Sequence, residues 1–102
     1  MQQALAASAA WVSDAHRLRK FRLHRAELRV TDLAAYDRSA RDTIAVGVRF
    51  MYRDHDSRGE RVGYFDRARR RFTALSADES RIINHFCATA NYVRHLPESD
   101  YP

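Results

Sequence analysis

The stretch RVGYFDRARRRFTALSADESRIINHF, residues 61–86, decides the expected fold. Valine, aromatic and isoleucine residues gather in three short runs at 62–65, 72–75 and 82–86, and two polar segments separate the runs. This spacing is typical of antiparallel strands that follow one another as a meander. We therefore expect three neighbouring strands in this part of the chain.

A fourth strand is expected just before this stretch, over residues 43–53. Apolar side chains occupy every second position there, which places one side of a strand against the core. They are Ile44, Val46, Val48, Phe50 and Tyr52. The pattern predicts an α+β fold in which two to three N-terminal helices pack on a four-stranded antiparallel meander.

Two helices are expected between positions 13 and 44. Ser13 can cap a helix over residues 15–28, and Thr31 can cap a second helix that ends near residues 42–44. In each helix, apolar residues recur at the spacing of one helical face. They are Leu18, Phe21 and Leu28 in the first helix, and Leu33, Tyr36, Ala40 and Ile44 in the second.

A chain of 102 residues is expected to form a single domain, because this length supports one modest core. We expect a helix or frayed end at 1–12, a helical layer at 13–44, the sheet at 43–96 and a tail at 97–102. The single cysteine, Cys87, cannot form an intramolecular disulfide. No cofactor is expected, and no apolar run reaches the roughly 18 residues of a membrane span. These features favour the cytoplasm, or delivery into a target cell if the domain belongs to a toxin.

The charge of the chain favours a polyanionic partner such as RNA. Lys and Arg number 18 against 13 Asp and Glu, which gives a formal net charge of +5. Basic and aromatic residues are interleaved around the expected strands, as binding of single-stranded RNA requires for phosphate neutralisation and base stacking. They are Arg61, Tyr64, Arg69, Arg70, Arg71, Tyr92 and Arg94. Taken separately, the tyrosine fits a core position and the arginines fit a solvated turn.

Histidine is the first candidate for chemistry. His24 and Lys20 lie one turn apart on the same face of the expected helix. An imidazole beside a fixed cation suits phosphodiester cleavage, because the imidazole moves the proton and the cation stabilises charge on the phosphate. A surface histidine without a role is the plainer alternative. On the last strand, alternation places His85 on the face opposite Asn84 and with Ile83, unless a β-bulge intervenes.

A metal site is not expected. Asp54, His55 and Asp56 are adjacent in sequence rather than spaced for ligation. His55, like His16 and His95, is expected to be solvated.

Two segments resemble a known group of domains. Residues 20–44, KFRLHRAELRVTDLAAYDRSARDTI, resemble the H-F-x-K-H-G-x-E-F-x-x-x-(S/T)-x-x-x-Y-x-x-x-A segment of many C-terminal domains of bacterial polymorphic toxins. Residues 63–86 look like the strand segment of the same domains, Y-x-D-P-x-T-x-x-F-x-V-x-x-D-G-x-I-x-T-x-F-x-P. These domains are RNase toxins related to barnase, EndoU, certain colicins and RelE. The resemblance implies N-terminal helices packed on a four-stranded antiparallel sheet.

The resemblance also implies functional residues, position by position. They are His24 for the second histidine of the helical motif, Tyr36 for its tyrosine, Asp66 for the turn aspartate, Phe72 for the strand phenylalanine and Tyr92 for a final tyrosine. Asn84 stands where the family has a threonine, and Lys20 replaces the first histidine of the motif.

Residues and resemblance together predict a metal-independent endoribonuclease domain of the toxin type, in which a ribose 2′-hydroxyl attacks the adjacent phosphate. The expected catalytic residues are His24, Lys20, Asn84 and Tyr92. The expected substrate-binding residues are Arg61, Tyr64, Arg71 and His85. RNA and an acidic antitoxin or immunity protein are the expected partners, with no membrane and no small-molecule cofactor.

Two other functions fit the same residues. The chain suits a nucleic-acid-binding module of a mobile element that does not cleave, or an interaction domain whose sheet edge or basic helix binds an acidic protein. The nuclease hypothesis depends on one spatial arrangement. The imidazole of His24 must face the concave side of the sheet, close to Asn84, Tyr92 or His85.

Overall fold

The protein is described by a computed structural model that covers residues 2–102, and this part of the chain forms four helices and a five-stranded sheet. The helices are α1 (Gln2–Ser8), α2 (Asp14–Leu28), α3 (Leu33–Val46) and α4 (Ala90–Arg94). The strands are β1 (Ala10–Trp11), β2 (Val48–Arg53), β3 (Glu60–Asp66), β4 (Arg71–Ser76) and β5 (Arg81–Cys87). The α+β class expected from the sequence is therefore confirmed.

The sheet is mixed, in the order β1-β5-β4-β3-β2. The expected four-stranded antiparallel meander runs from β2 to β5, and β1 adds a fifth strand that is parallel to β5. Ala10 and Trp11 pair with Arg81 and Ile82. Two residues are too few to show an alternating pattern, so this strand could not be predicted from the sequence.

The cap expected for α2 is confirmed, whereas the cap of α3 lies one residue later than expected. The Ser13 hydroxyl accepts a hydrogen bond from the backbone N–H of His16 at 3.0 Å, and the Asp32 carboxylate accepts one from Ala35 at 2.8 Å. The second cap is thus Asp32 rather than Thr31. Each bond satisfies a backbone donor that has no partner within its own helix.

The boundary between α3 and β2 differs from the expected one. α3 continues to Val46, so the strand expected over residues 43–53 begins only at Val48. The helix continues because the four-residue spacing of Tyr36, Ala40 and Ile44 buries all three side chains completely. The alternation of apolar residues that begins at Ile44 therefore does not form a strand before Val48. Gly47 then separates the two elements, at a position where a Cβ would lie only 2.6 Å from the Thr43 carbonyl oxygen.

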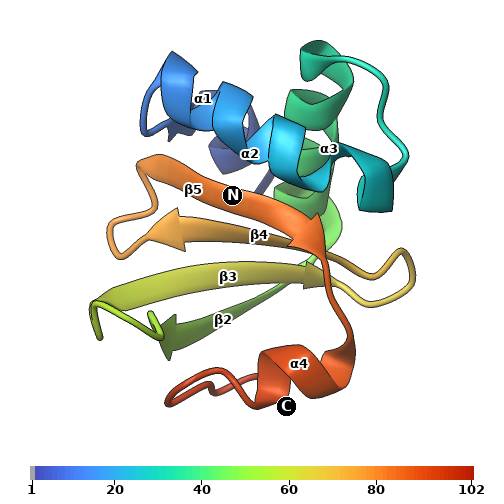
Figure 1. The fold of residues 1–102 in the computed structure, drawn as a ribbon. Coiled ribbons are helices and arrows are strands. Elements are labelled where there is room, and N and C mark those ends of the chain that lie inside the picture. The colour runs from blue at the N-terminus through green and yellow to red at the C-terminus, as the bar shows by residue number, and fades with distance from the viewer. Residues whose placement is uncertain (1) are drawn as a thin grey trace.

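The sheet has two differently covered faces (Figure 1). We call them the helix face, which packs against α3 and the apolar side of α2, and the α4 face, which packs against α4 and the C-terminal segment. α1 packs on α3, while α2 lies along the β5 edge. An aromatic cluster holds the α4 face together. It comprises Phe50, Tyr52, Phe65, Phe72, Phe86 and Tyr101.

A β-bulge in β5 decides which side chains reach the α4 face. Ala74 pairs with Asn84, whereas the next residue of β4, Leu75, pairs with Ile82, so Ile83 is the extra residue. Ile82 and His85 consequently face the helix face, and Asn84 faces the α4 face. The expected separation of Asn84 from His85 is confirmed. The neighbour expected on the face of His85 was wrong, because Ile82 rather than Ile83 shares that face, while Phe86 shares the face of Asn84 as expected.

Side chains of α2 and α3, together with Asn84 of β5 itself, close the exposed edge of β5. Four backbone groups beyond the short β1 strand receive side-chain partners, which removes the unpaired ladder that an edge strand otherwise presents. The bonds join His16 to the Ile83 carbonyl at 2.6 Å, Asn84 to the His85 N–H at 2.9 Å, Tyr36 to the His85 carbonyl at 2.7 Å, and Glu27 to the Cys87 N–H at 2.9 Å. His16 is therefore half-buried and bonded, not solvated as expected.

The opposite edge, at β2, is covered by the C-terminal segment. The N–H of Arg53 donates to the Pro97 carbonyl at 2.8 Å, and Met51 exchanges two bonds with Asp100, at 3.0 and 2.7 Å. Around these residues the β2 edge has little backbone left to pair with another protein.

Candidate functional site

A cavity of about 200 Å³ opens on the α4 face, between α2 and α4. We call it the α4-face pocket. Four of the eight site residues predicted from the sequence line it, and they come from four different elements. They are Lys20 of α2, Arg61 of β3, Asn84 of β5 and Tyr92 of α4. The fold thus brings together three predicted catalytic residues and one predicted substrate-binding residue.

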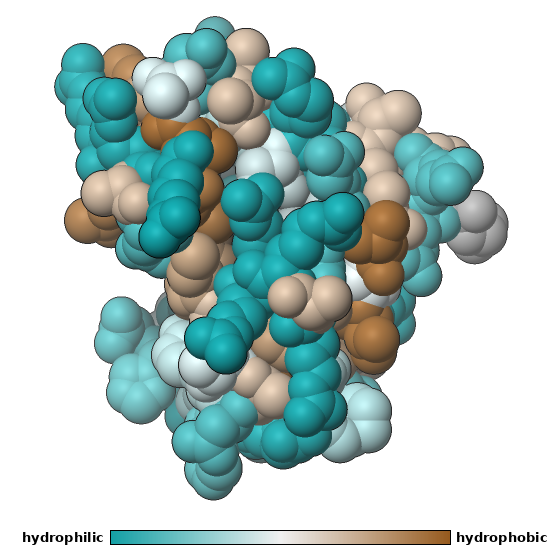
Figure 2. All heavy atoms as spheres, turned by 90° about the vertical axis from the view of Figure 1, so that its right-hand side faces the viewer, coloured by the Kyte–Doolittle hydropathy of each residue, from teal (hydrophilic) through white to brown (hydrophobic). Residues whose placement is uncertain are grey.

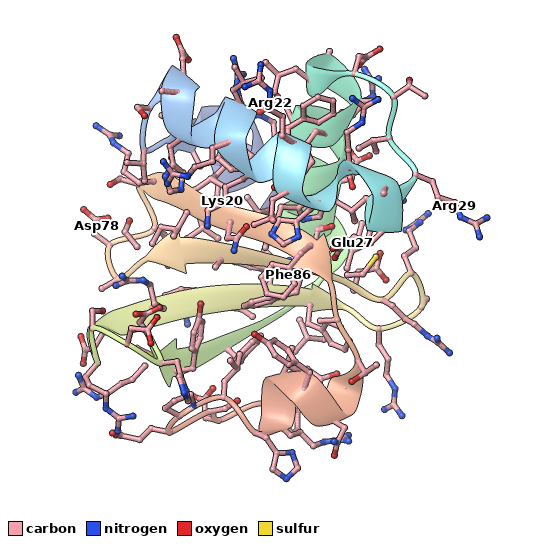
Figure 3. All side chains as sticks on the ribbon, viewed as in Figure 1. Lys20, Arg22, Glu27, Arg29, Asp78 and Phe86 are labelled. Atoms are coloured by element: carbon pink, nitrogen blue, oxygen red, sulfur yellow. The ribbon has the colours of Figure 1, made fainter. Side chains whose placement is uncertain are left out.

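Lys20 and Arg61 give the pocket two cations without close acidic partners. Among residues 2–102, neither side chain lies within 4.0 Å of a carboxylate oxygen. Figure 3 shows Lys20 on the side of α2 that faces β5, whereas Arg22 points away on the opposite side. The two cations can therefore attract an anion into the pocket.

Asp54 adds one negative charge to the lining of the pocket. Its carboxylate accepts hydrogen bonds from the backbone N–H of Ser57 at 2.9 Å and of Asp56 at 3.3 Å. The Ser57 bond, helped by the charge of Arg61, lowers the pKa of Asp54. The carboxylate is thus bound by its own loop. With one acid and two cations in its lining, the pocket carries a net positive charge.

Asn84 presents hydrogen-bond donors to the pocket. Its Oδ1 accepts the backbone N–H of His85 at 2.9 Å, and only the oxygen of the carboxamide can accept. This bond fixes the orientation of the side chain and leaves the Nδ2 amino group, which has no partner among residues 2–102, available to a ligand. A phosphate oxygen is a suitable acceptor for such a group.

Tyr92 and Phe86 form the aromatic wall of the pocket. The two rings meet edge to face, with centroids 5.8 Å apart and planes at 80°. Tyr92 is still 46% exposed, and burial raises the pKa of its phenol. The hydroxyl therefore keeps its proton at neutral pH and can donate it in a hydrogen bond.

The predicted catalytic histidine, His24, lies behind this wall. Its imidazole stacks on Phe86 with the centroids 5.2 Å apart, and Nδ1 lies 3.0 Å from a carboxylate oxygen of Glu27. Nε2 is buried and has no partner within residues 2–102. The ring faces the sheet rather than bulk water, as expected, but Phe86 stands between it and the pocket, whose lining does not include His24. Figure 3 shows Phe86 near the C-terminal end of β5, with Glu27 beside it.

His85, predicted to bind substrate, belongs to the core of the helix face. It is completely buried, and Nδ1 donates to the Phe72 carbonyl at 3.1 Å while Nε2 accepts from the Ser39 hydroxyl at 2.7 Å. Burial lowers the pKa of His85 to about 3, so the ring is neutral. A substrate cannot reach it without unfolding this region, and its role is packing.

Tyr64 and Arg71 also lie outside the α4-face pocket. The Tyr64 hydroxyl, on the helix face, donates to Glu79 at 2.6 Å. The Arg71 guanidinium donates to the Ser39 hydroxyl at 2.8 Å and to the Leu28 carbonyl at 3.3 Å. Both side chains therefore have intramolecular partners where the sequence analysis predicted substrate contacts.

The structure adds His55 to the candidate residues. It lies in the exposed loop between β2 and β3 and lines the α4-face pocket. From the sequence we expected it to be solvated and without a role. In the sequence, only its position next to Asp54 and before a hairpin turn could have indicated a functional role. The conformation of the loop decides whether the side chain of His55 reaches the sheet.

The protein has other basic surfaces and another large cavity. Exposed arginines at the β3–β4 turn and at the end of α2 lie on a mainly hydrophilic side of the molecule (Figure 2). A cavity of about 580 Å³ lies between α1 and α3, and two of its three arginines, Arg17 and Arg41, contact acids. Asp37 binds Arg41 at 3.0 Å and accepts a hydrogen bond from the Trp11 indole at 2.7 Å. The α4-face pocket is the better candidate for an anion, because its cations have no such partners.

Comparisons with known proteins add no relative. No protein family matches the chain, and no match is found among curated proteins or solved structures. Within residues 2–102, no three His, Cys, Asp or Glu side chains are grouped so that they could hold a metal ion. None of the helices described is both long and apolar enough to cross a membrane.

Proposed function

We propose that the protein is an endoribonuclease domain that binds single-stranded RNA over its α4 face and cleaves it through attack of a ribose 2′-hydroxyl. The observation that carries the proposal is the α4-face pocket, where Lys20, Arg61 and the Nδ2 of Asn84 surround a space between aromatic rings. Cations neutralise phosphate, and exposed rings stack on bases.

The reaction requires that one proton is accepted and another is supplied. His55 would accept the proton of the 2′-hydroxyl as the O2′–P bond forms, since imidazole exchanges protons near neutral pH. Tyr92, which keeps its proton, would donate it to the O5′ atom as the P–O5′ bond breaks. Lys20, Arg61 and Asn84 would stabilise the charge that develops on the phosphate oxygens. The products are a 2′,3′-cyclic phosphate and a free 5′-hydroxyl.

Cleavage of a short single-stranded RNA by the purified protein tests this assignment. The reaction is run in EDTA to silence metal-dependent contaminants, with single-stranded DNA of the same sequence as the substrate that lacks the attacking hydroxyl. We expect RNA to be cut and DNA to be bound but left intact. His55→Gln should lower the rate about 100-fold, the usual contribution of a general base.

Two matched variants assign the roles within the site. Lys20→Gln should weaken RNA binding, whereas Arg22→Gln, the same charge change on the opposite side of α2, should alter affinity by less than about twofold. His24→Gln should keep most of the activity because Phe86 separates His24 from the pocket. A rate that collapses in His24→Gln and persists in His55→Gln would restore the assignment made from the sequence and overturn this one.

A second candidate function is RNA binding without cleavage. It is favoured by the fact that His55 is the single histidine lining the pocket among residues 2–102. Binding that weakens steeply with salt, without any cyclic phosphate product at any pH, would select this function over the nuclease.

A further inference from the structure

A second and larger cavity, of about 620 Å³, adjoins the α4-face pocket. His55, Tyr92 and Leu96 line both cavities, so these three side chains lie on the border between them. The second cavity extends over α4 and the segment that follows it, where Asn91 and His95 are exposed. We call it the α4 cavity.

We propose that the α4 cavity binds a nucleobase of the RNA whose phosphate occupies the α4-face pocket, and that Asn91 reads the edge of this base. The inference rests on the proposed function and deepens it, because it turns a phosphate site into one with base preference. The two cavities divide a nucleotide according to its chemistry. Lys20 and Arg61 line only the smaller cavity, whereas among residues 2–102 the larger one is lined by aromatic, imidazole and amide side chains without a lysine or arginine.

Tyr92 supplies the surface on which the base stacks. Its ring is nearly half exposed, and the edge-to-face contact with Phe86 holds the ring in one orientation. The backbone N–H of Tyr92 donates to the Thr89 hydroxyl at 3.1 Å, which anchors the start of α4. A ring that is already oriented loses little entropy when a base stacks on it.

Asn91 and His95 supply polar groups to this cavity, and a hydrogen bond holds the His95 ring in place. The backbone carbonyl oxygen of Asn91 accepts hydrogen bonds from the backbone N–H of His95 at 3.2 Å and from the Nδ1 of the His95 ring at 2.8 Å. Because a carbonyl only accepts, Nδ1 carries the hydrogen, and Nε2 of the neutral ring is an acceptor. The Asn91 carboxamide has no partner among residues 2–102 and offers a donor and an acceptor side by side. Such a pair distinguishes base edges, which differ in their order of donors and acceptors.

A single-stranded occupant is favoured over a duplex by this arrangement. Stacking on Tyr92 requires an exposed base face, and in an RNA helix the neighbouring base pairs cover both faces. The adjoining cations Lys20 and Arg61 complement the charge of the backbone.

Affinities for RNA pentanucleotides test the inference. The probes are oligoadenylate, oligocytidylate, oligouridylate and a chain whose central nucleotide lacks a base, all with 2′-fluoro groups so that nothing is cut. For the wild type we expect dissociation constants that differ several-fold among the bases, and binding of the abasic chain that is about tenfold weaker. Asn91→Ala should reduce the differences among bases, since only an exposed side chain is removed.

Two further variants separate stacking from phosphate binding. Tyr92→Leu should lower the affinity for the base-containing probes roughly tenfold and the affinity for the abasic probe little. Tyr92→Phe, which keeps the ring, should bind all probes within about twofold of the wild-type affinity. Lys20→Gln should lower the affinity for all probes by the same factor. It should also reduce the dependence of that affinity on salt by the amount expected for about one phosphate contact.

The possible failures can be told apart. Equal, salt-dependent affinity of the wild type for all four probes would overturn the base site and leave the phosphate site standing. Absence of binding to any probe would overturn both this inference and the proposed function.

Discussion

The two faces of the sheet differ in whether their polar side chains have hydrogen-bond partners within the protein. On the helix face, a buried histidine, serine and threonine are joined by hydrogen bonds, and an arginine completes the network. They are His85, Ser39, Thr73 and Arg71. On the α4 face, the Asn84 amino group, the Lys20 ammonium and the Tyr92 hydroxyl have no protein partners within residues 2–102 and border a cavity.

This difference separates polar residues that hold the fold from those available to a ligand. A buried polar group without a partner costs about 1–3 kcal/mol, so the helix face must satisfy its own groups. The groups on the α4 face are open to water, which can be exchanged for a ligand at little cost. The residue type alone does not distinguish the two cases, since histidine and tyrosine occur on both faces.

The two histidines give the largest expected contrast. His85→Ala should lower the free energy of unfolding by about 3 kcal/mol, because it opens a cavity and leaves Ser39 and Thr73 without their partner. His55→Ala should change it by less than about 0.5 kcal/mol, as expected for an exposed loop residue. Urea unfolding of both variants measures this. Equal destabilisation would show that His55 is also structural.

The pH dependence of stability follows from the same buried ring. Burial lowers the pKa of His85 in the folded protein from 6.5 to about 3, so the unfolded chain binds a proton that the folded protein does not. The contribution of His85 to stability should therefore be present above about pH 6.5 and be lost as the pH is lowered from 6.5 towards 3, with a slope of at most about 1.4 kcal/mol per pH unit. Urea titrations in His85→Gln should show this slope removed. An unchanged slope would assign it to other groups.

A pair of tyrosines tests the contrast on a smaller scale. Tyr36→Phe removes a buried hydroxyl that donates to the His85 carbonyl, and should cost about 1–2 kcal/mol of unfolding free energy. Tyr92→Phe removes a hydroxyl without a protein partner and should cost no more than a few tenths. Thermal and urea unfolding of both variants would compare them directly, and the contrast fails if Tyr92→Phe is the more destabilised.

The smallest expected difference in stability is between two variants of Asn84. Asn84→Asp keeps the oxygen that accepts the His85 N–H and should unfold within about 0.5 kcal/mol of the wild type. Asn84→Ala loses that acceptor and should cost about 1 kcal/mol. Affinity for RNA should fall most in Asn84→Asp, because a carboxylate repels phosphate. Tighter RNA binding by Asn84→Asp would contradict the assigned orientation of the side chain.

Local patterns in the sequence predicted most of the framework. The runs at 62–65, 72–75 and 82–86 lie within three observed strands, and the apolar stripes of α2 and α3 face the core. The short β1 strand was missed because a two-residue pairing carries no local signal. The bulge at Ile83 was missed as well, because the register between β4 and β5 decides it.

The site was predictable only in part, for the same reason. Lys20 and Asn84 were chosen from the helix motif and the strand pattern, and the packing of α2 along β5 then placed both beside one cavity. His24 carried the strongest local signal, yet the Phe86 ring screens it. His55 carried almost none, because only the conformation of its loop brings it to the sheet. Contacts distant in sequence decide which histidine a ligand can reach.

The most direct test is a titration of ¹⁵N-labelled protein with an uncleavable single-stranded RNA pentanucleotide, followed by NMR. The Asn84 side-chain amino group gives its own pair of resonances and therefore reports on the α4-face pocket. We expect these resonances, together with the backbone amides of Arg61 and Tyr92, to shift most. Shifts confined to the arginine-rich β3–β4 turn or to the cavity between α1 and α3, with Asn84 unmoved, would contradict the account.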